Sequence, residues 1–423
     1  MNFEAKRLGD VAEIVGGGTP STKDASNWDG DIPWLTPKDL SSFEGIYVDR
    51  GSRSITEKGF RSSSAKMLPA GAVLYTSRAP IGYVAIANHS ISTNQGFKSL
   101  ILKDGYVPEF VFYLLKASKS EIESHASGGT FAEISAKALS NVVLQFPPKV
   151  QQEAIAKILL SLDEKIAANN ALSKTLEDIA QTIFKSWFID FDPVKAKMAG
   201  EKPAGMDAAT ATLFPDSMEE SELGLIPKGW KACQLNSVLM LHKSTIKAGT
   251  ATESVPYVPI DQIGARDIFL KNSMPGSEAK TSLVSFKKNE ILFGAMRPYF
   301  HKVVLAPFNG TTRTTTFVLG AVNPKYLSYS LLTVYQDDAV AYATNHSQGT
   351  TIPYAVWNNS FENYPIVLPS ETTATAFNDL VLPLIEYGYS LVIENQKLAQ
   401  IRDGLLPRLI SGELQIPEEL LVS

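Results

Sequence analysis

The sequence contains one long pattern written twice. GAVLYTSRAPIGYVAIA, from Gly71 to Ala87, returns as NEILFGAMRPYFHKVVLA, from Asn289 to Ala306. Two more blocks return in the same order, PEFVFYLLK as PKYLSYSLL and SGGTFAEISAKALSNVVLQFP as SQGTTIPYAVWNNSFENYPIVLP. The second copy follows the first by 216 to 222 residues, far beyond the roughly 20 to 50 residues of a solenoid repeat. Each copy is therefore a whole domain with its appendage, which suggests two similar tasks on two different targets.

Length and composition are typical of a globular protein with two or three domains. The chain has 423 residues, 44% hydrophobic and 20% charged, and a domain averages about 150 residues. No apolar run approaches the roughly 18 residues of a membrane span, and the first residues hold no signal-peptide core. A single cysteine, Cys233, excludes a disulfide framework and a cysteine zinc cluster, and no histidine motif accompanies it as a nucleophile. We expect a cytoplasmic protein.

The net charge of −5 is unevenly distributed. Residues 1 to 149 carry 16 Lys and Arg against 15 Asp and Glu, and residues 222 to 369 carry 13 against 9. Residues 150 to 221 carry 7 against 12, and residues 370 to 423 carry 3 against 8. The two domains are thus neutral to basic and the other segments acidic, a division compatible with a polyanionic ligand for the domains. Surplus glutamate on helices would explain the acidic segments equally well.

Both acidic segments show heptad spacing. Apolar residues and one asparagine stand seven apart at Ile155, Leu162, Asn169, Leu176 and Ile183, with a second row at Ile158, Leu172 and Ile179 that Lys165 and Ser186 interrupt. The second segment repeats the spacing at Phe377, Leu384, Leu391, Leu398 and Leu405. Two such seams in one chain predict an antiparallel pair of long helices that bury each other.

Three residues modify this prediction. Asn169 falls on the seam, where a polar residue costs stability but fixes register. Pro383 and Gly388 lie inside the second helix, and because proline removes a backbone hydrogen bond, we expect a late start or a kink there. A helix of 37 residues, from Gln151 to Trp187, would rise about 55 Å at ~1.5 Å per residue. By its length the pair is a spacer.

Each copy combines short apolar runs, bounded by Gly, Pro, Asn and Ser, with a helical stretch, so we predict an α+β domain. The predicted organisation is a first domain at 1–149, a central helix at 150–189, a linker at 190–221, a second domain at 222–369, a C-terminal helix at 370–410 and a tail at 411–423.

Motifs for catalysis are weak. GGGTPSTK, from Gly16 to Lys23, departs from the phosphate-binding pattern G-x-x-x-x-G-K-[ST] and is interpreted as a flexible turn after the first strand. DFDP, at Asp190, lacks the aromatic residue of an amino-methyltransferase motif, and no glycine-rich cofactor strand precedes it. The five histidines show no metal-ligand spacing. We therefore expect no catalytic, cofactor-binding or metal-binding residue in this chain.

Polar loop residues suited to DNA stand out instead. Arginine presents a planar donor fork to guanine or phosphate, and Asn and Gln pair with adenine. Arg78 and Arg297 occupy corresponding places in the two copies, each close to a proline. The candidate DNA-contacting residues are Thr36, Lys38, Ser77, Arg78, Asn94, Gln95, Gly128, Gly129 and Thr130 in the first copy, and Arg297, Tyr299, Arg313, Gln348, Gly349, Thr350 and Thr351 in the second.

The order of several motifs resembles the specificity subunit of type I restriction-modification systems. These motifs are LGDVAEIVGGGTPSTKDASNWDGDIPWLTPKDL, a GGT loop, the helix QQEAIAKILLSLDEKI, then KSWFIDFDPV, IPKGW and IRDGLLPRLISGEL. The resemblance spans essentially the whole chain. It implies two target recognition domains that each read half of a split DNA sequence and are separated by two long helices. Gly128, Gly129 and Thr130 match the family's loop, and Gln348, Gly349 and Thr350 are its counterpart, with Gln in place of the first Gly.

The same resemblance implies the partners. Two methyltransferase subunits would bind the helices at 151–187 and 371–410, and restriction subunits would join the cleaving complex. S-adenosylmethionine, ATP and magnesium would belong to those subunits, and this chain would supply the sequence specificity.

Two other function classes stay open from the residues alone. A methyltransferase or nuclease with built-in specificity would need a cofactor or metal motif. A scaffold that joins two domains without binding DNA would explain the repeat and the helices equally well. Methylation by the isolated chain would favour the first of these, and failure to bind DNA in complex with methyltransferase subunits would favour the second.

Overall fold

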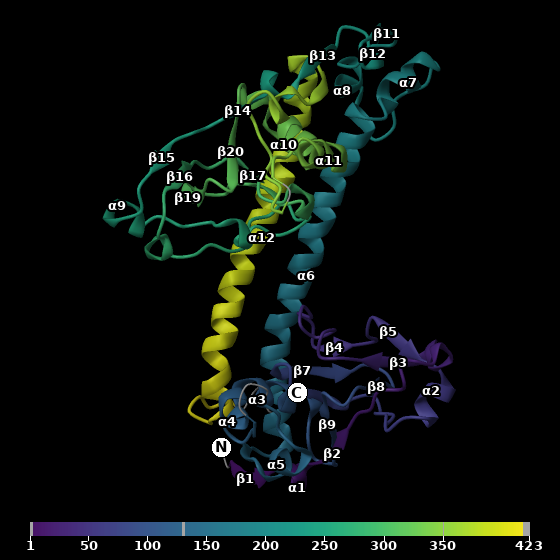
Figure 1. The fold of residues 1–423 in the computed structure, drawn as a ribbon, viewed down its shortest axis with the longest axis vertical. Coiled ribbons are helices and arrows are strands. Elements are labelled where there is room, and N and C mark those ends of the chain that lie inside the picture. Colours follow the sequence, from purple (N-terminus) through teal and green to yellow (C-terminus); the bar gives the residue numbers. More distant parts are fainter. Residues whose placement is uncertain (1–2, 129–131, 350, 418–423) are drawn as a thin grey trace. The chain divides into compact units, whose positions relative to one another are not determined.

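The computed structural model describes residues 3–128, 132–349 and 351–417. The chain forms two compact units, of which unit 1 comprises residues 1–167 and 395–423 and unit 2 comprises residues 168–394. Each unit holds one mixed α/β domain and one end of each of two long helices, so the predicted fold class is confirmed (Figure 1). The sequence predicts a segment of its own for each long helix. In the structure, each of these two helices is divided between the two units.

Unit 1 is built on a five-stranded sheet of order β2-β9-β6-β7-β4, with a three-stranded sheet β5-β3-β8 and a strand pair β1-β10. The central strand β6 is buried at every position, which explains its continuous apolar and small-polar sequence. The elements are β1 (Glu4–Arg7), α1 (Leu8–Val11), β2 (Ala12–Gly16), β3 (Trp28–Leu35), β4 (Tyr47–Val48), β5 (Arg53–Ile55), α2 (Glu57–Arg61), β6 (Val73–Ser77), β7 (Ile81–Ala87), β8 (Ser92–Thr93), β9 (Lys98–Leu102), α3 (Pro108–Ala117), α4 (Lys119–Ser124), α5 (Ala136–Asn141) and β10 (Val143–Phe146).

Unit 2 repeats this plan with a four-stranded sheet of order β14-β20-β17-β18, a three-stranded sheet β15-β16-β19 and the pair β13-β21. The elements are α7 (Asp192–Met198), α8 (Ala208–Thr212), β11 (Met218–Ser221), β12 (Gly224–Pro227), β13 (Lys231–Gln234), β14 (Leu239–Leu241), β15 (Thr245–Ile246), α9 (Thr250–Glu253), β16 (Leu283–Phe286), β17 (Ile291–Gly294), β18 (Val303–Leu305), β19 (Gly310–Arg313), β20 (Thr316–Ala321), α10 (Leu327–Tyr335), α11 (Asp337–Asn345) and β21 (Pro365–Leu368). The order β14-β20-β17-β18 matches β2-β9-β6-β7, which makes the sequence repeat a structural one.

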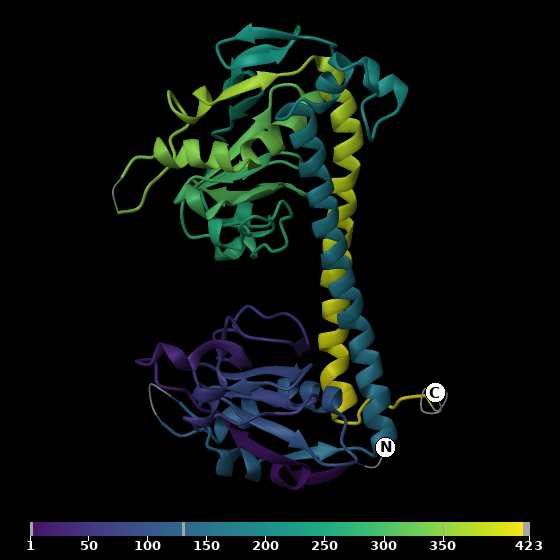
Figure 2. The same ribbon diagram turned by 90° about the vertical axis from the view of Figure 1, so that its right-hand side faces the viewer.

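Two helices of 40 residues each, α6 (Lys149–Phe188) and α12 (Glu371–Ile410), run antiparallel and side by side in both units (Figure 2). In unit 1, Asp163 of α6 pairs with Arg402 of α12. In unit 2, the Nδ2 of Asn169 donates to the Oε2 of Glu394 at 2.9 Å. Asn169 is 2% exposed, so this seam asparagine is a buried polar residue with a specific partner that favours one register.

Burial separates the two predicted heptad rows of α6. Ile155, Asn169 and Leu176 of the first row are buried, as the seam requires. Leu172 and Ile179 of the second row are 36% and 42% exposed. The assignment of these two residues to the seam was wrong. Fewer residues of α6 are buried than the two heptad rows predicted.

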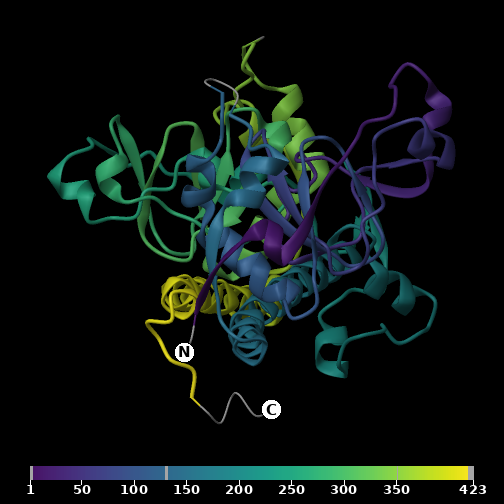
Figure 3. The same ribbon diagram turned by 90° about the horizontal axis from the view of Figure 1, so that it is seen from below.

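In unit 1, one end of each long helix belongs to the core of the domain. Ile155 and Leu159 of α6, together with Leu409 and Ile410 of α12, pack in one cluster with the buried aromatic residues of α3. Figure 3, viewed along the helices, shows α6 and α12 adjacent at this end. Ile416, beyond the end of α12, joins the same cluster and is 7% exposed.

In unit 2, the opposite ends of the helices meet in an aromatic cluster. The ring of Phe377 lies 4.9 Å from that of Phe188, 5.6 Å from Trp187 and 6.0 Å from Phe184, measured between ring centroids. Phe188 also contacts Tyr329 of α10 at 5.0 Å. These helix ends therefore belong to the hydrophobic core of the second domain.

The second long helix begins at Glu371 and continues through Pro383 and Gly388. Of the two expected outcomes, a late start or a kink, the late start was wrong, and the kink stays a prediction. Proline removes one backbone donor, but Val381 and Ile385 on either side of Pro383 are buried, and their burial favours the continuous helix. Gly388 has a clear packing role, because a Cβ atom there would lie 2.2 Å from the Cζ of Phe269. Tyr389 next to it donates to the Ile268 carbonyl at 3.2 Å.

Within the described ranges, no helix combines the length and the apolarity needed to cross a membrane.

Candidate nucleic-acid interface

The first candidate surface lies where strand β6 of unit 1 ends. The backbone nitrogen of Ser77 donates to the Gly96 carbonyl at 2.7 Å, and the Gly96 nitrogen donates to the Oδ1 of Asn94 at 2.8 Å. Ser77 and Arg78 are thereby joined to the turn that carries Asn94 and Gln95. Ser77 is buried, Arg78 and Asn94 are half-buried, and Gln95 is exposed. The structure brings these four predicted residues together.

Two residues absent from the sequence-based prediction organise this surface. The Glu133 carboxylate lies 3.3 Å from the guanidinium of Arg78 and 3.3 Å from the ammonium of Lys98. The Ile134 nitrogen next to Glu133 donates to the Ser77 carbonyl at 3.1 Å. A lone Glu and a lone Lys carry no signal in a sequence, because their meaning depends on the turn that brings them together.

Residue Gly128 belongs to a loop closed by Ser127 and Glu133, whose backbones exchange two hydrogen bonds of 3.0 Å. Gly128 has φ of 102°, a left-handed conformation that glycine adopts without strain. Gly129 and Thr130, predicted here, lie outside the described residues.

Thr36 and Lys38 lie in a turn that adjoins the same surface. A carboxylate oxygen of Asp39 accepts hydrogen bonds from both the nitrogen and the hydroxyl of Thr36 at 2.7 Å. The other oxygen accepts from the Ser52 nitrogen at 2.9 Å. Burial acts to raise the pKa of Asp39, but these hydrogen bonds outweigh it and hold that pKa below its usual value. Lys38 is exposed, and a Cβ at Gly96 would lie 2.8 Å from Pro37, which places this turn against the 94–96 turn.

The glycine-rich turn after β2, predicted to be a flexible turn, is packed in the structure. The Gly18 nitrogen donates to the Thr93 carbonyl at 2.9 Å, and the Trp34 indole donates to the Gly18 carbonyl at 2.9 Å. A Cβ at Gly17 would lie 2.2 Å from the Asn94 carbonyl oxygen, so only glycine fits there. Thr19 hydrogen-bonds the side chain of Gln95. The turn thus supports the Asn94 and Gln95 segment.

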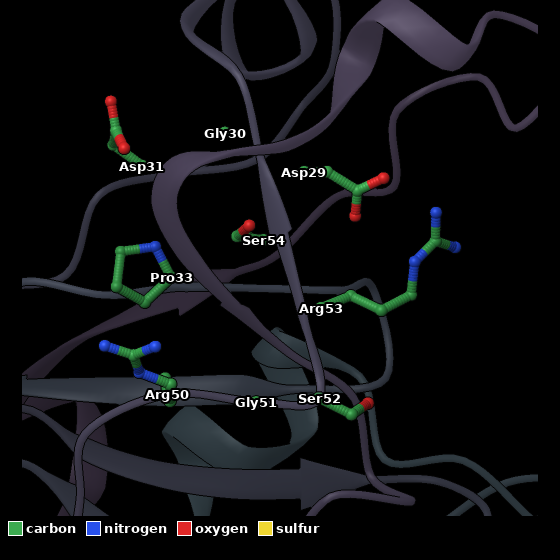
Figure 4. A pocket seen from close by; sticks show the side chains of 9 residues that line it. All are labelled: Asp29, Gly30, Asp31, Pro33, Arg50, Gly51, Ser52, Arg53 and Ser54. Atoms are coloured by element: carbon green, nitrogen blue, oxygen red, sulfur yellow. The ribbon is translucent and has the colours of Figure 1, made fainter.

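A polar pocket of about 310 Å³ adjoins the Thr36 turn through Ser52. Figure 4 shows Arg50 and Arg53 extending to opposite sides of it, with Asp31 on the side of Arg50 and Asp29 on the side of Arg53. The Arg53 guanidinium lies 3.6 Å from the ring centre of Trp28, a stacked arrangement that fixes the planar group. The two arginines and the two aspartates of this pocket balance in formal charge.

The second candidate surface lies at the matching edge of unit 2. The Arg297 nitrogen donates to the Pro353 carbonyl at 2.8 Å, and Gln348 and Tyr354 exchange two backbone hydrogen bonds of 2.8 Å. The nitrogens of Ala295 and Met296 both donate to the Thr315 carbonyl, two residues beyond Arg313. The structure therefore gathers Arg297, Gln348, Gly349 and Thr351 on one edge, with Arg313 beside them. Thr350 lies outside the described residues.

The surface of unit 2 is more apolar than that of unit 1. Tyr299 and Phe300 are 50% and 47% exposed, and their ring centroids lie 4.8 Å apart. Ile352 and Tyr354 in the neighbouring loop are 41% and 38% exposed. The Nε of Arg297 is buried and, among the described residues, has no hydrogen-bond partner.

Backbone hydrogen bonds correct the alignment of the two copies. Ser77 and Ala295 make the same bond, to Gly96 and Thr315 respectively. Arg297 therefore corresponds to Ala79, and both have a left-handed backbone, with φ of 53° and 57°. The predicted correspondence of Arg78 with Arg297 was wrong by one residue. The two arginines align by residue type, but the backbone position of Arg78 is equivalent to that of Met296.

The same correction applies to the closing loops. The bridge between Ser127 and Glu133 is equivalent to that between Gln348 and Tyr354. Gly349, with φ of 91°, thus occupies the place of Gly128. The prediction that Gln348 replaces the first glycine was wrong, since the left-handed position retains a glycine in both copies.

In the part of the chain that the structure describes, no group of three or more His, Cys, Asp or Glu side chains is arranged to hold a metal ion. Cys233 is a free, half-buried thiol on β13.

Known proteins are similar to this chain in sequence and in fold. A family model described as type I restriction modification DNA specificity domain matches residues 1–178. The type I restriction enzyme MjaIX specificity subunit of Methanocaldococcus jannaschii is 34% identical over 440 residues, which cover 99% of this chain and 94% of that protein. The chain belongs to the family of type I restriction enzyme specificity subunits. The resemblance identified in the sequence is confirmed.

Two further relatives agree. The type I restriction enzyme HindI specificity subunit of Haemophilus influenzae is 25% identical over 411 residues, covering 84% of this chain and 89% of that protein. The crystal structure of a type I restriction-modification S subunit from M. genitalium matches with a TM-score of 0.57 at 16% identity, over 99% of this chain and 97% of that one. At this identity the match supports the fold alone.

Proposed function

We propose that this chain is the DNA-reading subunit of a type I restriction-modification enzyme, in which each unit recognises one half of a bipartite target. The observation that carries the proposal is the pair of loop surfaces at equivalent places in the fold, one at the end of β6 and one at the end of β17, in a chain of the specificity-subunit family. Each surface combines an arginine with amide or hydroxyl side chains. These groups suit base edges and phosphates.

The proposed chemistry resides in other subunits. Two methyltransferase subunits would bind the long helices and hold S-adenosylmethionine, and restriction subunits would supply ATP- and magnesium-dependent cleavage. This chain would be non-catalytic and would select the DNA sequence. The test is to compare the isolated chain with its complex with the methyltransferase subunits. We expect sequence-specific binding and methylation only in the complex, and sequencing of methylated bases in the host would reveal the target.

Arg297 is the first residue to test within unit 2. Within the described ranges its Nε has no hydrogen-bond partner, and its backbone nitrogen donates to the Pro353 carbonyl. Arg297→Ala should weaken binding of the complex to its target by about 1 to 3 kcal/mol, the value of a good base contact. Titrations at several salt concentrations would measure this loss. Lys325→Ala, which removes an exposed lysine paired with Glu371, is the control, and unchanged binding by Arg297→Ala would remove that residue from the site.

Exposed isoleucines on the long helices are candidate docking residues for the methyltransferase subunits. Ile179 of α6 is 42% exposed and lines a shallow groove of about 280 Å³ with Thr175 and Thr182. Ile401, 222 residues later in α12, is 50% exposed. The repeat therefore places one exposed isoleucine at the same point of each helix, as two equivalent docking sites would require.

We expect Ile179→Asp or Ile401→Asp to weaken binding of one methyltransferase subunit by about tenfold or more, because a charge would be buried against an apolar partner surface. Mass photometry of the complex at falling concentration would measure the loss of one subunit. Leu225→Asp, at a 58% exposed position on β12, is the matched control. Full assembly of both isoleucine variants would contradict this docking site.

A further inference from the structure

The Glu133 carboxylate in unit 1 is divided between two cations. Its Oε1 accepts from the Lys98 ammonium and its Oε2 from the NH1 group of Arg78, each at 3.3 Å. The Lys98 side chain is 15% exposed, and its ammonium also donates to the Ser77 hydroxyl at 3.3 Å. The Arg78 and Glu133 side chains are 39% and 38% exposed. The largely buried Lys98 thus forms an ion pair with Glu133, and Glu133 forms a second ion pair with the more exposed Arg78.

This arrangement limits what Arg78 can bind. A guanidinium has five N–H donors in one plane, and a donation from NH1 to Glu133 leaves the others available in a fixed orientation. A phosphate approaching Arg78 would be repelled by the adjacent carboxylate. The O6 and N7 atoms of guanine carry no net charge and accept two parallel hydrogen bonds from arginine.

We propose that Lys98 and Glu133 are positioning residues that make Arg78 a reader of guanine rather than an anchor for phosphate. The proposal rests on the proposed function and assigns one base of the half-site read by unit 1. Glu133 also lowers non-specific DNA binding, because its negative charge reduces the positive charge that Arg78 and Lys98 together offer to any phosphate.

Among the described residues of the second copy, the corresponding positions do not form this ion-paired cluster, which gives an internal contrast. By the corrected alignment, Arg78, Lys98 and Glu133 correspond to Met296, Phe317 and Tyr354. Arg297 stands one residue further along and makes its backbone contact with the Pro353 carbonyl. An ion-paired arginine at this turn is therefore a property of unit 1, and the guanine it reads belongs to one half of the target.

The first test joins a protein change to a base change. Duplexes carrying the target found by methylated-base sequencing would be made with 7-deazaguanine at one guanine at a time, which removes N7. For wild-type complex, one such duplex should bind about tenfold more weakly, and Arg78→Ala should lose the same factor and become insensitive to that duplex. Equal effects of the base change in both proteins, or a target in which no guanine couples to Arg78, would overturn the proposal.

The second test changes the positioning residue. Glu133→Gln keeps the shape but removes the negative charge, so Arg78 is free to bind phosphate. We expect the slope of log affinity against log salt to steepen by about one unit on unrelated DNA, and discrimination at the coupled guanine to fall about tenfold. Glu57→Gln, which breaks an exposed 2.7 Å pair with Arg61 on α2, is the matched control.

The outcomes separate two failures. A wild-type complex without sequence-specific binding would refute the proposed function itself. Specific wild-type binding, combined with an unchanged salt slope and unchanged guanine discrimination in Glu133→Gln, would refute only the role of Glu133. Melting temperature and retention of methyltransferase subunits should stay at wild-type values in this variant, which distinguishes positioning from folding.

Discussion

Replacing Phe377 by alanine is expected to lower the free energy of unfolding of unit 2 by about 3 to 5 kcal/mol, the range for a buried phenylalanine. Phe377 is completely buried, and three aromatic residues of α6 surround it. Truncation would leave a cavity between α12 and α6 that rigid rings cannot fill. Urea unfolding monitored by tryptophan fluorescence would measure the change, since Trp187 lies in the same cluster.

The control for this prediction is Phe300→Ala in the same unit. Phe300 is 47% exposed, so its loss should change the free energy of unfolding by no more than about 0.5 kcal/mol. Similar stability of the two variants would mean that the helix ends do not belong to the cooperative core of unit 2. A large loss for Phe377→Ala alone would show that the long helices and the second domain unfold together.

Insertion of one helical turn after Ala167 is expected to abolish methylation at the original target and to create a new target with the same halves and a longer spacer. Ala167 is the last residue of unit 1 on α6, and unit 2 begins at Ala168. A turn adds about 5.4 Å along a helix, which is more than one base pair at about 3.4 Å. Sequencing of methylated bases in cells carrying the variant would give the new target directly.

The same residues inserted at Gly205 serve as the control for this second prediction. Gly205 lies between α7 and α8, outside the long helices, and a side chain there would meet no atom within 4 Å. This insertion should leave both the halves and the spacer unchanged. An unaltered spacer after insertion at Ala167 would contradict the idea that the helices set the distance between half-sites.

The sequence predicted the parts of the structure that depend on local pattern. The repeat, the α+β domains and the antiparallel helices follow from period and composition, and all were confirmed. Local pattern failed in the late start expected from Pro383, where the helix begins at Glu371, and at Leu172 and Ile179, which share the heptad spacing but are exposed.

The candidate surfaces were predictable by residue type only in part. Arg78, Asn94 and Gln95 could be selected because their chemistry suits DNA, and the structure gathers them on one edge. Lys98 and Glu133 could not be selected, since a single ion pair between distant positions has no sequence spacing. Whether each of these residues contacts DNA stays a prediction.

By itself, the sequence determined that this chain has two similar domains joined by two paired helices, because repeats and heptads are properties of residue order. Only the tertiary structure decided which positions of the two copies are equivalent. Backbone hydrogen bonds show that Arg297 is equivalent to Ala79, and Gly349 to Gly128. Turn geometry follows φ and hydrogen bonding rather than similarity of side chains. The structure likewise decided that Arg78 is held by a carboxylate, a contact that folding alone creates.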